Sequence, residues 1–454
     1  MNKVKITVYI SSHNYGRYLK DAVESVLRQT IDGWELFLID DNSKDKTKDI
    51  MELYRGDKRI KLLKTSGIGL PRVANLALKH SKGNYIMRLD ADDVLDENIL
   101  LVLSNYLNRH EDIAFVFPDY FLVDEHGEII RYEGRQSVYN KNHLLDLPAN
   151  GACTMIRKSI LKGLGGYRED LGAQDGFDLW TRALKKHKCA NVNIPLFYYR
   201  RHGENLTENK TMILSARRSI KKDACAVNLD KFRPINAVIP CRRHYDIYPD
   251  LWNKKLGGKT LLDITVETCL ASKIFDKIIV TSDNPDVRKK ISGYGHKRLM
   301  FIERSRESTI CSRSIVYTLE QINKKLKIEQ KGLTIVSYIH TPFIKTETLE
   351  EAVYTLIMNN TDSAFAVEEM DSPLYRRTQY GLMPINPKDK LKSDFDVVYK
   401  ELRTSLATKN TNVKNGSLTG SKISYFVIPK EEAFFIDSKT EYEIAKILNR
   451  NRLK

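Results

Sequence analysis

The chain has 454 residues, enough for two or three domains, and its hydrophobic fraction of 42% can fill ordinary cores, which excludes a wholly disordered protein. No run approaches the ~18 apolar residues that cross a bilayer, and no apolar signal segment precedes the first strand-like pattern. The scattered cysteines lack the close spacing of metal ligands and read as reduced thiols: Cys153, Cys189, Cys225, Cys241, Cys269 and Cys311. These features predict an intracellular, cytoplasmic enzyme or binding protein.

The formal net charge is +16 at pH 7. A basic surface can attract nucleotide phosphates, nucleic acid or the anionic inner face of a membrane. The alternative is a lysine-rich composition spread over a solvated surface. Because the sequence contains no RNA- or DNA-binding motif, we expect no nucleic-acid partner. Peripheral association with a membrane stays open.

The first half of the chain alternates between strand-like and helix-like patterns. Residues 4–10 and 35–39 read as strands, and apolar residues at helical spacing predict a helix between them that contains Leu19 and Val26. Pro71 opens a further helix, since proline suits a first helical turn, and residues 85–89 form another buried strand. Polar clusters follow these strands. Parallel α/β sheets bind ligands at that edge, so the pattern predicts a nucleotide-binding α/β domain.

The alternation restarts near residue 235. Residues 235–239 read as a first strand, a helix follows around residues 262–270, and residues 277–280 read as the next strand. The charged, helix-prone segment before this restart marks the boundary. We therefore predict a first domain over residues 1–215, a helical linker over 216–233 and a second α/β domain over 234–454. Residues 408–412, rich in asparagine, lysine and threonine, are predicted to form a mobile loop in the second domain.

The carboxylates that follow the strand at residues 85–89 need a partner, because clustered like charges repel. A divalent cation would supply one, since magnesium and manganese bind hard oxygen ligands and bridge phosphate oxygens. Asp90 and Asp92 are separated by one residue, so a bend can point both toward one ion, or toward an ion and a ribose. A lone Asp-x-Asp also occurs in solvated turns.

Three ordered blocks make the first half resemble the family 2 glycosyltransferases. They are ISSHNYGRYL at residues 10–19 with SVLRQT at 25–30, LIDDNSKDKT at 38–47, and a third block that runs from Gly69 through residues 82–86 to DADD at 90–93. The resemblance covers about residues 4–205, and several blocks in the same order are far more specific than one motif. It implies a glycosyltransferase A-type fold and a nucleotide-sugar donor.

The resemblance also implies roles for individual residues. Ser12 and Asp40 would line the base and ribose pocket, with Asp41 beside them, and Arg72 would face the nucleotide. Asp90 would lie near the ribose and metal, and Asp92 would be the main metal ligand. The alternatives are that Asp41 caps the following turn and that Arg72 pairs with a surface acid. The ending FYYRRH at residues 197–202 is similar to the Tyr-Arg-x-His ending of these enzymes, so His202 would complete the metal shell or contact a phosphate; a purely structural histidine is the alternative.

The segment AQDGFDLWTR at residues 173–182 resembles the family's acceptor site, where an acidic pair precedes an aromatic residue and Asp-Leu-Trp. Here Gln174 replaces the usual glutamate and Gly176 adds a residue. Asp175 is therefore the candidate base and Asp178 its rival. The ordinary expectation for Asp178 is that it caps the helix containing Trp180.

The second half resembles the cytidylyltransferases that activate sialic acid and related acidic sugars as CMP-sugars. The matching pieces lie at residues 237–242, 256–262, 271–283, 414–416 and 436–441. The family's phosphate loop needs small residues and lysines. This chain keeps Arg242 and Pro249 but has bulky Tyr245 and acidic Asp246 and Asp250. Of the two metal-binding aspartates near the carboxyl terminus, one position holds Phe435 and the other keeps Asp437.

The function expected from these resemblances is inverting, metal-dependent glycosyl transfer, with Mn²⁺ or Mg²⁺, from a nucleotide-sugar donor. The acceptor would be a glycan or lipid-linked, in surface polysaccharide biosynthesis on the cytoplasmic face of the membrane. The substitutions in the phosphate loop and at position 435 predict that the second domain no longer makes CMP-sugars. Two alternatives remain: a bifunctional enzyme that also makes a CMP-activated acidic sugar, and a second domain that serves only for assembly, for instance as a homodimer contact, or for binding.

Overall fold

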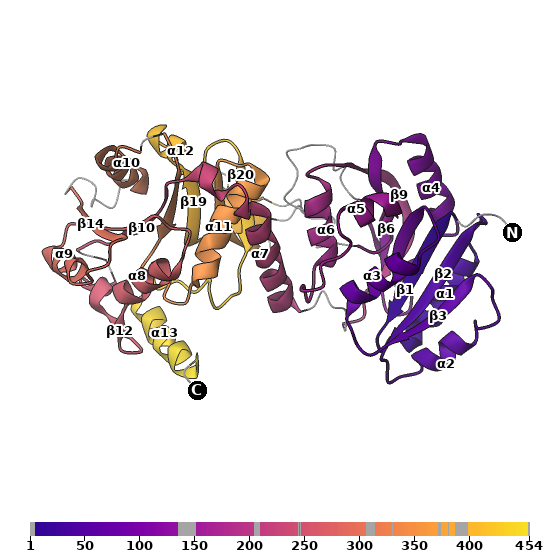
Figure 1. Cartoon of the computed structure of the whole chain (residues 1–454). Helices are drawn as coiled ribbons and strands as arrows, with labels where there is room; N and C mark the ends of the chain where they lie inside the picture. Colours follow the sequence, from indigo (N-terminus) through magenta and orange to yellow (C-terminus); the bar gives the residue numbers. More distant parts are fainter. Residues whose placement is uncertain are drawn as a thin grey trace. The chain divides into compact units, whose positions relative to one another are not determined.

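A computed structural model describes residues 5–134, 151–203, 209–243, 245, 247–305, 314–328, 330–370, 374–379, 381–385 and 398–452. The chain divides into two compact units, Met1–Ile220 and Lys221–Lys454 (Figure 1). This division falls inside the segment 216–233 that the sequence assigns to a linker. A single helix, α7 (Lys210–Ala226), begins in the first unit and ends in the second. None of the described helices is long and apolar enough to cross a membrane.

The first unit is built on a nine-stranded sheet in the order β3-β2-β1-β4-β8-β6-β9-β5, with β7 paired to β6. Strands β1 to β4 run parallel to one another, β8 is antiparallel to both β4 and β6, and β6 and β9 are parallel. The strands are β1 (Ile6–Ser12), β2 (Trp34–Asp41), β3 (Ile60–Thr65), β4 (Tyr85–Asp90), β5 (Val94–Leu95), β6 (Ile113–Val123), β7 (Ile129–Glu133), β8 (Met155–Arg157) and β9 (Lys188–Arg200). The expected strands at residues 4–10, 35–39 and 85–89 are thus present.

Helices cover both faces of this sheet. They are α1 (Gly16–Leu27), α2 (Thr47–Glu52), α3 (Leu70–His80), α4 (Ile99–Arg109), α5 (Lys158–Gly163) and α6 (Asp175–Ala183). Helices α1 and α4 pack with alternate residues of β1, such as Val8, in one core, whereas Trp180 of α6 packs its ring 5.3 Å from that of Phe115. Pro71 lies in the first turn of α3, as expected.

A glycine is required where α1 begins. A Cβ added at Gly16 would lie 2.6 Å from the backbone nitrogen of Thr47, which is too close for any other residue. The Gly16 amide donates to Asp45 Oδ2 at 2.7 Å, so the loop after β1 is held against the loop after β2. The first two sequence blocks therefore meet at the carboxyl edge of the sheet.

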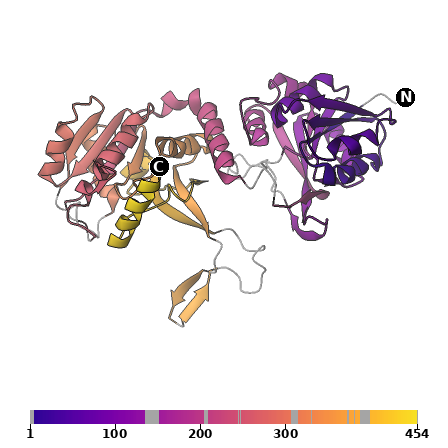
Figure 2. The same cartoon turned by 90° about the horizontal axis from the view of Figure 1, so that it is seen from below.

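The second unit has a seven-stranded sheet in the order β14-β13-β10-β15-β19-β16-β20. These strands are β10 (Ile235–Pro240), β13 (Lys277–Ser282), β14 (Leu299–Glu303), β15 (Leu333–Ser337), β16 (Ser363–Met370), β19 (Val398–Lys409) and β20 (Ile423–Val427). The helices are α8 (Leu261–Ala271), α9 (Pro285–Ser292), α10 (Ile315–Leu326), α11 (Thr346–Asn359), α12 (Asn410–Lys414) and α13 (Lys439–Arg452). Strands β11 (Lys255–Leu256) and β12 (Lys259–Thr260) form a two-stranded ribbon, and so do β17 (Tyr375–Thr378) and β18 (Gly381–Pro384) (Figure 2). Two α/β domains are therefore present, as expected.

The predicted mobile loop at residues 408–412 is wrong. Lys409 ends β19 and Asn410 begins α12, where the Asn410 side chain is fully buried. Asn410 Nδ2 donates to the carbonyl of Lys331 at 2.6 Å, and Asn412 Nδ2 donates to that of Asp362 at 2.9 Å. Asparagine is typical of loops, but these amides bind main-chain carbonyls from neighbouring segments and so hold the strand end in place.

Candidate active site

The parallel strands of the first unit bring the predicted donor residues to one edge. Ser12 pairs in register with Asp40 across β1 and β2, and Ser11 pairs with Asp90 across β1 and β4. Asp92 lies in the loop that follows β4. The carboxyl ends of three neighbouring strands therefore carry Ser12, Asp40, Asp41 and Asp90, where an α/β sheet binds its ligand.

The two aspartates that end β2 are both occupied by main-chain donors. Asp40 Oδ1 accepts from the amide of Ser43 at 2.8 Å and so closes its own turn. Asp41 accepts from the Thr65 hydroxyl at 2.5 Å and from the amides of residues 67–69 at 2.7 to 3.0 Å. Burial raises the pKa of Asp41, but these hydrogen bonds outweigh it and lower the pKa. Asp41 thus holds the loop before α3 and not the turn that follows it.

Asp92 and His202 are brought together from segments 110 residues apart. Asp92 Oδ2 and His202 Nε2 lie 2.9 Å apart, and the His202 side chain is fully buried. The imidazole packs 5.0 Å from the Tyr18 ring and 5.6 Å from the Tyr15 ring, measured between centroids. This contact supports the expectation that the two residues belong to one site.

Arg200 fixes the loop that carries Asp92. Its Nε donates to the Asp92 carbonyl at 2.9 Å, and its backbone amide donates to Asp93 Oδ1 at 3.0 Å. Asp93 is 1% exposed, and its Oδ2 has no hydrogen-bond partner among the described residues. Burial, and then the neighbouring Asp92 and Asp90, raise the pKa of Asp93 well above its ordinary value. Sequence reasoning singled out neither Arg200 nor Asp93, although both lie inside the quoted blocks.

The residues present fit a divalent cation in part. Asp92 and His202 offer a carboxylate oxygen and an imidazole nitrogen, which manganese accepts as ligands. The unpartnered oxygen of Asp93 lies in the same loop. Within the described part of the chain, however, no group of three or more His, Cys, Asp or Glu side chains is arranged to hold a metal ion. Asp90 turns toward Arg88 instead.

Arg88 connects the predicted donor and acceptor sites. This residue lies in β4 and is 7% exposed; its Nε is 2.9 Å from Asp90 Oδ1, and its Nη1 donates to Asp175 Oδ2 at 2.8 Å. Burial raises the pKa of Asp90 to about 6, against the opposing effect of Arg88. Sequence reasoning missed Arg88 because the strand pattern around it reads as apolar.

The two candidate bases differ in their surroundings. Asp175 is the first residue of α6, 8% exposed, and bonds Arg88. Asp178 lies one turn further on and binds Arg182 at 2.8 Å, while Arg168 Nη1 is 3.6 Å away. The expectation that Asp178 caps the helix is wrong, because the cap position belongs to Gln174. Arg182 also donates to two main-chain carbonyls, so Asp178 belongs to a structural network.

Arg72, which is predicted to contact the nucleotide, forms an ion pair with a surface acid, Glu169. Its Nε lies 3.4 Å from Glu169 Oε2, and both side chains are about half exposed. Asn75, one turn along α3, donates to the Tyr167 carbonyl and to Glu169, each at 2.9 Å. This face of α3 therefore holds the segment that leads to α6. A nucleotide contact by Arg72 stays a prediction.

Aromatic side chains occupy the carboxyl edge of the second sheet. His340 stacks on Phe435 with centroids 5.0 Å apart and an interplanar angle of 4°, and the Tyr245 ring meets it edge-on at 5.0 Å. The Tyr245 hydroxyl accepts from the Arg242 amide at 2.9 Å. Asp250 lies 3.4 Å from Lys254 in an ion pair, while Asp246 lies outside the described residues. Tyr245 and Phe435, which break the family's motifs, thus pack against the same imidazole.

His340 is expected to make the second domain acid-sensitive. Burial, and then the Arg242 charge, lower the pKa of His340 to about 4, against 6.5 in an unfolded chain. The unfolded state therefore takes up a proton first, and stability should be lost as pH falls from about 6.5 to about 4, by up to about 3 kcal/mol. Urea unfolding at pH 7, 6 and 5 should show this loss in the wild type and a flatter profile in His340→Phe, which keeps the stacking. Equal pH profiles would contradict it.

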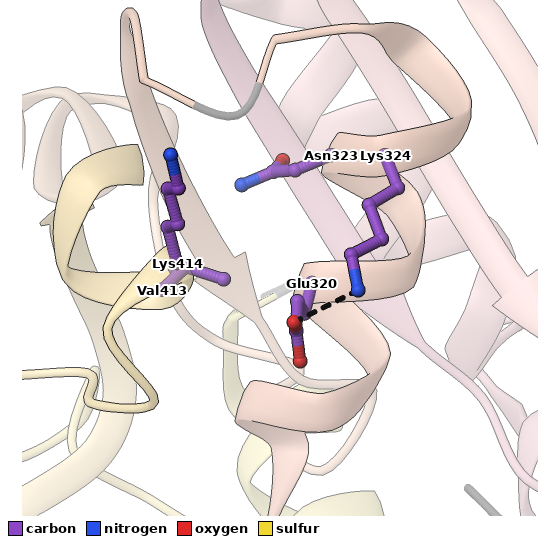
Figure 3. Close-up of a pocket in the computed structure, with 5 residues that line it drawn as sticks. All are labelled: Glu320, Asn323, Lys324, Val413 and Lys414. Atoms are coloured by element: carbon purple, nitrogen blue, oxygen red, sulfur yellow. Dashed lines mark ion pairs between the residues drawn. The ribbon is translucent and has the colours of Figure 1, made fainter.

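Two hollows of the second unit include none of the predicted site residues. One, of about 10 Å³, is lined by Glu320, Asn323, Lys324, Val413 and Lys414, and a 3.0 Å ion pair joins Lys324 to Glu320 along its wall (Figure 3). It has room for about one water molecule. The other, of about 410 Å³, lies at the amino end of β15, around Lys331 and Leu333.

Comparison with known protein families finds one match within each of the two compact units. Residues 7–165 match the Glycosyl transferase family 2, and residues 253–451 match the Cytidylyltransferase family. The chain is thus a fusion of two nucleotide-binding-type α/β domains. The first domain is similar to family 2 of the glycosyltransferases and the second to the cytidylyltransferases, and each match covers less than half of the chain. The first match ends before Asp175 and His202, and the second begins after the loop that contains Tyr245.

The relatives are distant, and the chain covers only part of the length of each. An uncharacterized glycosyltransferase of Methanocaldococcus jannaschii is 29% identical over 196 residues, which are 40% of this chain and 66% of that protein. The Escherichia coli UDP-Glc:alpha-D-GlcNAc-diphosphoundecaprenol beta-1,3-glucosyltransferase WfgD is 27% identical, with 46% of this chain and 82% of that protein covered. E. coli chondroitin synthase is 22% identical, and the chain spans 36% of its length.

Solved structures resemble the first half at low similarity. The S. aureus TarS fragment in complex with UDP-GlcNAc is 18% identical, with a TM-score of 0.42, over 48% of this chain and 66% of that one. A mannosyltransferase from Pyrobaculum calidifontis, in complex with GDP-Man and Mn²⁺, is 15% identical, with a TM-score of 0.39, over 50% of this chain and 65% of that one.

Proposed function

We propose that the first domain is an inverting glycosyltransferase that moves a sugar from a nucleotide sugar to an acceptor hydroxyl. The observation that carries the proposal is the position of Asp175. This carboxylate comes from α6 and yet is joined through Arg88 to Asp90, which ends β4 at the donor edge. A base beside the donor site is the arrangement that a single displacement needs, because acceptor and sugar must meet there.

In the proposed reaction the acceptor oxygen attacks the anomeric carbon while the bond from that carbon to the diphosphate oxygen breaks. Asp175 takes the proton of the acceptor hydroxyl, and the nucleoside diphosphate leaves with the bonding electrons. Arg88 keeps the Asp175 carboxylate oriented and offsets its charge beside Asp90. A divalent cation, Mn²⁺ or Mg²⁺, held by Asp92 and His202 would neutralise charge on the departing diphosphate.

The donor pocket is proposed at the ends of β1 and β2. Ser12 and Asp40 are buried there, with the Ser12 hydroxyl 3.2 Å from that of Thr47. We assign base and ribose contacts to this pair and a supporting role to Asp41, since the side chain of Asp41 accepts hydrogen bonds from Thr65 and from the loop before α3. We propose a glycan or lipid-linked acceptor in polysaccharide synthesis at the inner face of the membrane. The similarity to WfgD, which acts on a diphosphoundecaprenol-linked sugar, supports the lipid-linked acceptor.

Release of nucleoside diphosphate tests the proposed activity. The full chain would be incubated with Mn²⁺ and UDP-glucose, UDP-N-acetylglucosamine or GDP-mannose, with and without a lipid-linked sugar acceptor. Acceptor-dependent release from one donor is expected. Release from none of a wider donor panel, by a folded protein, would contradict glycosyl transfer.

For the second domain we propose binding or assembly without cytidylyl transfer. Phe435 stands where the family places a metal-binding aspartate, and it stacks on His340. Tyr245, from the loop after β10, packs against the same imidazole. Three rings thus occupy the edge where small residues and lysines would have to approach a triphosphate. We propose a homodimer contact at the β17–β18 ribbon, where Tyr375 and Leu382, and Ile385 directly after β18, are more than half exposed.

We expect no pyrophosphate from CTP and an acidic nine-carbon sugar. The loss should be complete, because Phe435 removes a metal ligand and Tyr245 blocks backbone approach to the phosphates. A coupled pyrophosphate assay of the full chain at neutral pH measures it, with an active CMP-sugar synthetase as the positive control. Pyrophosphate that depends on both substrates would support the bifunctional alternative instead.

A further inference from the structure

The residue before the candidate base has an unusual backbone conformation. The backbone of Gln174 has φ 63°, in the left-handed region that residues other than glycine rarely adopt. It is the cap residue of α6, and its carbonyl accepts the Asp178 amide at 3.0 Å. Its side chain makes no cap hydrogen bond. Something else must hold this turn, because Asp175 begins the helix from it.

Helix α7 supplies that contact. Arg217 Nε donates to Gln174 Oε1 at 2.8 Å, and the Arg217 guanidinium carbon lies 5.5 Å from the ring centroid of Phe177, in the first turn of α6. One side chain therefore binds both the cap residue and the first turn of α6. Arg217 lies outside both family matches, at the carboxyl end of the first unit.

We propose that Arg217 is a positioning residue for sugar transfer, a proposal that rests on the function proposed for Asp175. The side chain of Asp175 is oriented by Arg88, and its backbone is oriented by Gln174, which Arg217 holds. Without Arg217 the left-handed turn loses its side-chain partner, and the carboxylate loses its fixed direction toward the acceptor. Geometry of a catalytic group controls rate strongly, because a displacement of about 1 Å can cost on the order of 10²-fold.

A glutamate at position 174, as the family usually has, would make an ion pair with Arg217. Gln174 has a side chain of the same length, and its uncharged amide oxygen accepts the hydrogen bond from Arg217. Gln174→Glu should therefore keep the turn, whereas Gln174→Ala should lose it in the same way as Arg217→Ala. The two alanine variants should act through one contact.

The test compares full-length Arg217→Ala, Gln174→Ala and the double variant, with Arg217→Lys as the conservative change. Lys222→Ala, at an exposed position of α7, is the matched control. Hydrogen exchange of the peptide spanning residues 171–180 needs no substrate and reports on the turn. Steady-state release of nucleoside diphosphate, from the donor that the wild type uses, reports on the reaction.

We expect both alanine variants to speed exchange in this peptide and to lower kcat at least tenfold, with donor KM unchanged. The double variant should lose no more than either single variant, Arg217→Lys should recover part of kcat, and Lys222→Ala should match the wild type. Wild-type exchange and kcat in folded Arg217→Ala or Gln174→Ala would overturn the proposal, and so would losses that multiply in the double variant. A wild type without donor turnover would instead defeat the proposed function, and the role of Arg217 with it.

Discussion

Replacing Asp175 by asparagine is expected to lower the rate of sugar transfer by about 10²–10⁴-fold, because the acceptor hydroxyl then has no base to take its proton. Asparagine has nearly the same shape and can still meet Arg88, whose second partner Asp90 is unchanged. Donor affinity should therefore stay within about threefold of the wild type. Single-turnover release of nucleoside diphosphate and calorimetric titration with the product nucleotide measure the two quantities.

Asp178→Asn is the matched control for this prediction. It removes a carboxylate one turn away that binds Arg182 and belongs to the structural network around residues 164–166. We expect lower thermal stability and retained transfer at a temperature where the variant is folded. Retained turnover in Asp175→Asn, together with its loss in Asp178→Asn, would move the base to Asp178.

Replacing Arg88 by leucine is expected to destabilise the first domain by about 3–5 kcal/mol, because it leaves the carboxylates of Asp90 and Asp175 without their buried counter-charge. The guanidinium lies within 2.9 Å of both. Urea denaturation, followed by a probe in the first domain, measures the change. Transfer should also be lost in this variant, since Asp175 loses its orientation.

Two variants separate the buried charge from ordinary surface effects. Arg55→Leu removes the cation of an exposed pair with Glu52 and should change the stability far less than Arg88→Leu does, because solvent screens an exposed pair. Adding Asp175→Asn to Arg88→Leu should recover part of the lost stability, since one uncompensated charge disappears. Equal costs for Arg88→Leu and Arg55→Leu would show that Arg88 does not balance these carboxylates.

Local sequence patterns were sufficient to predict the strands and helices that surround the candidate site of the first domain. Apolar runs ending at Asp40 and Asp90 predicted buried strands, and Pro71 predicted the start of α3, because each signal depends on neighbours in the sequence. Pattern failed at residues 408–412, where asparagine side chains bond main-chain carbonyls from other segments. It failed at Asp178 as well, since the cap residue is the left-handed Gln174, four residues before the expected cap.

Arg88 and Arg217 were not predicted as site residues, because only long-range contacts bring them to the site. Arg88 sits in a strand whose periodicity marks it as one more buried position, and only the fold brings Asp175 to it from 87 residues away. Arg217 lies 43 residues from Gln174, in a helix that reads as a solvated linker. The pairing of Asp92 with His202 could be expected, because a family resemblance joined the two segments before any geometry was known.

The melting temperature of the full chain with a panel of nucleoside diphosphates, with and without Mn²⁺, tests the central claim most directly. A ligand that binds only the folded state stabilises it by about 2.7 kcal/mol at a hundred times its Kd. We predict that one diphosphate raises the melting temperature only with Mn²⁺, that Asp92→Asn abolishes the rise, and that Asp437→Asn in the second domain preserves it. A rise caused by CTP alone, lost in Asp437→Asn and kept in Asp92→Asn, would contradict the account and put the working nucleotide site in the second domain.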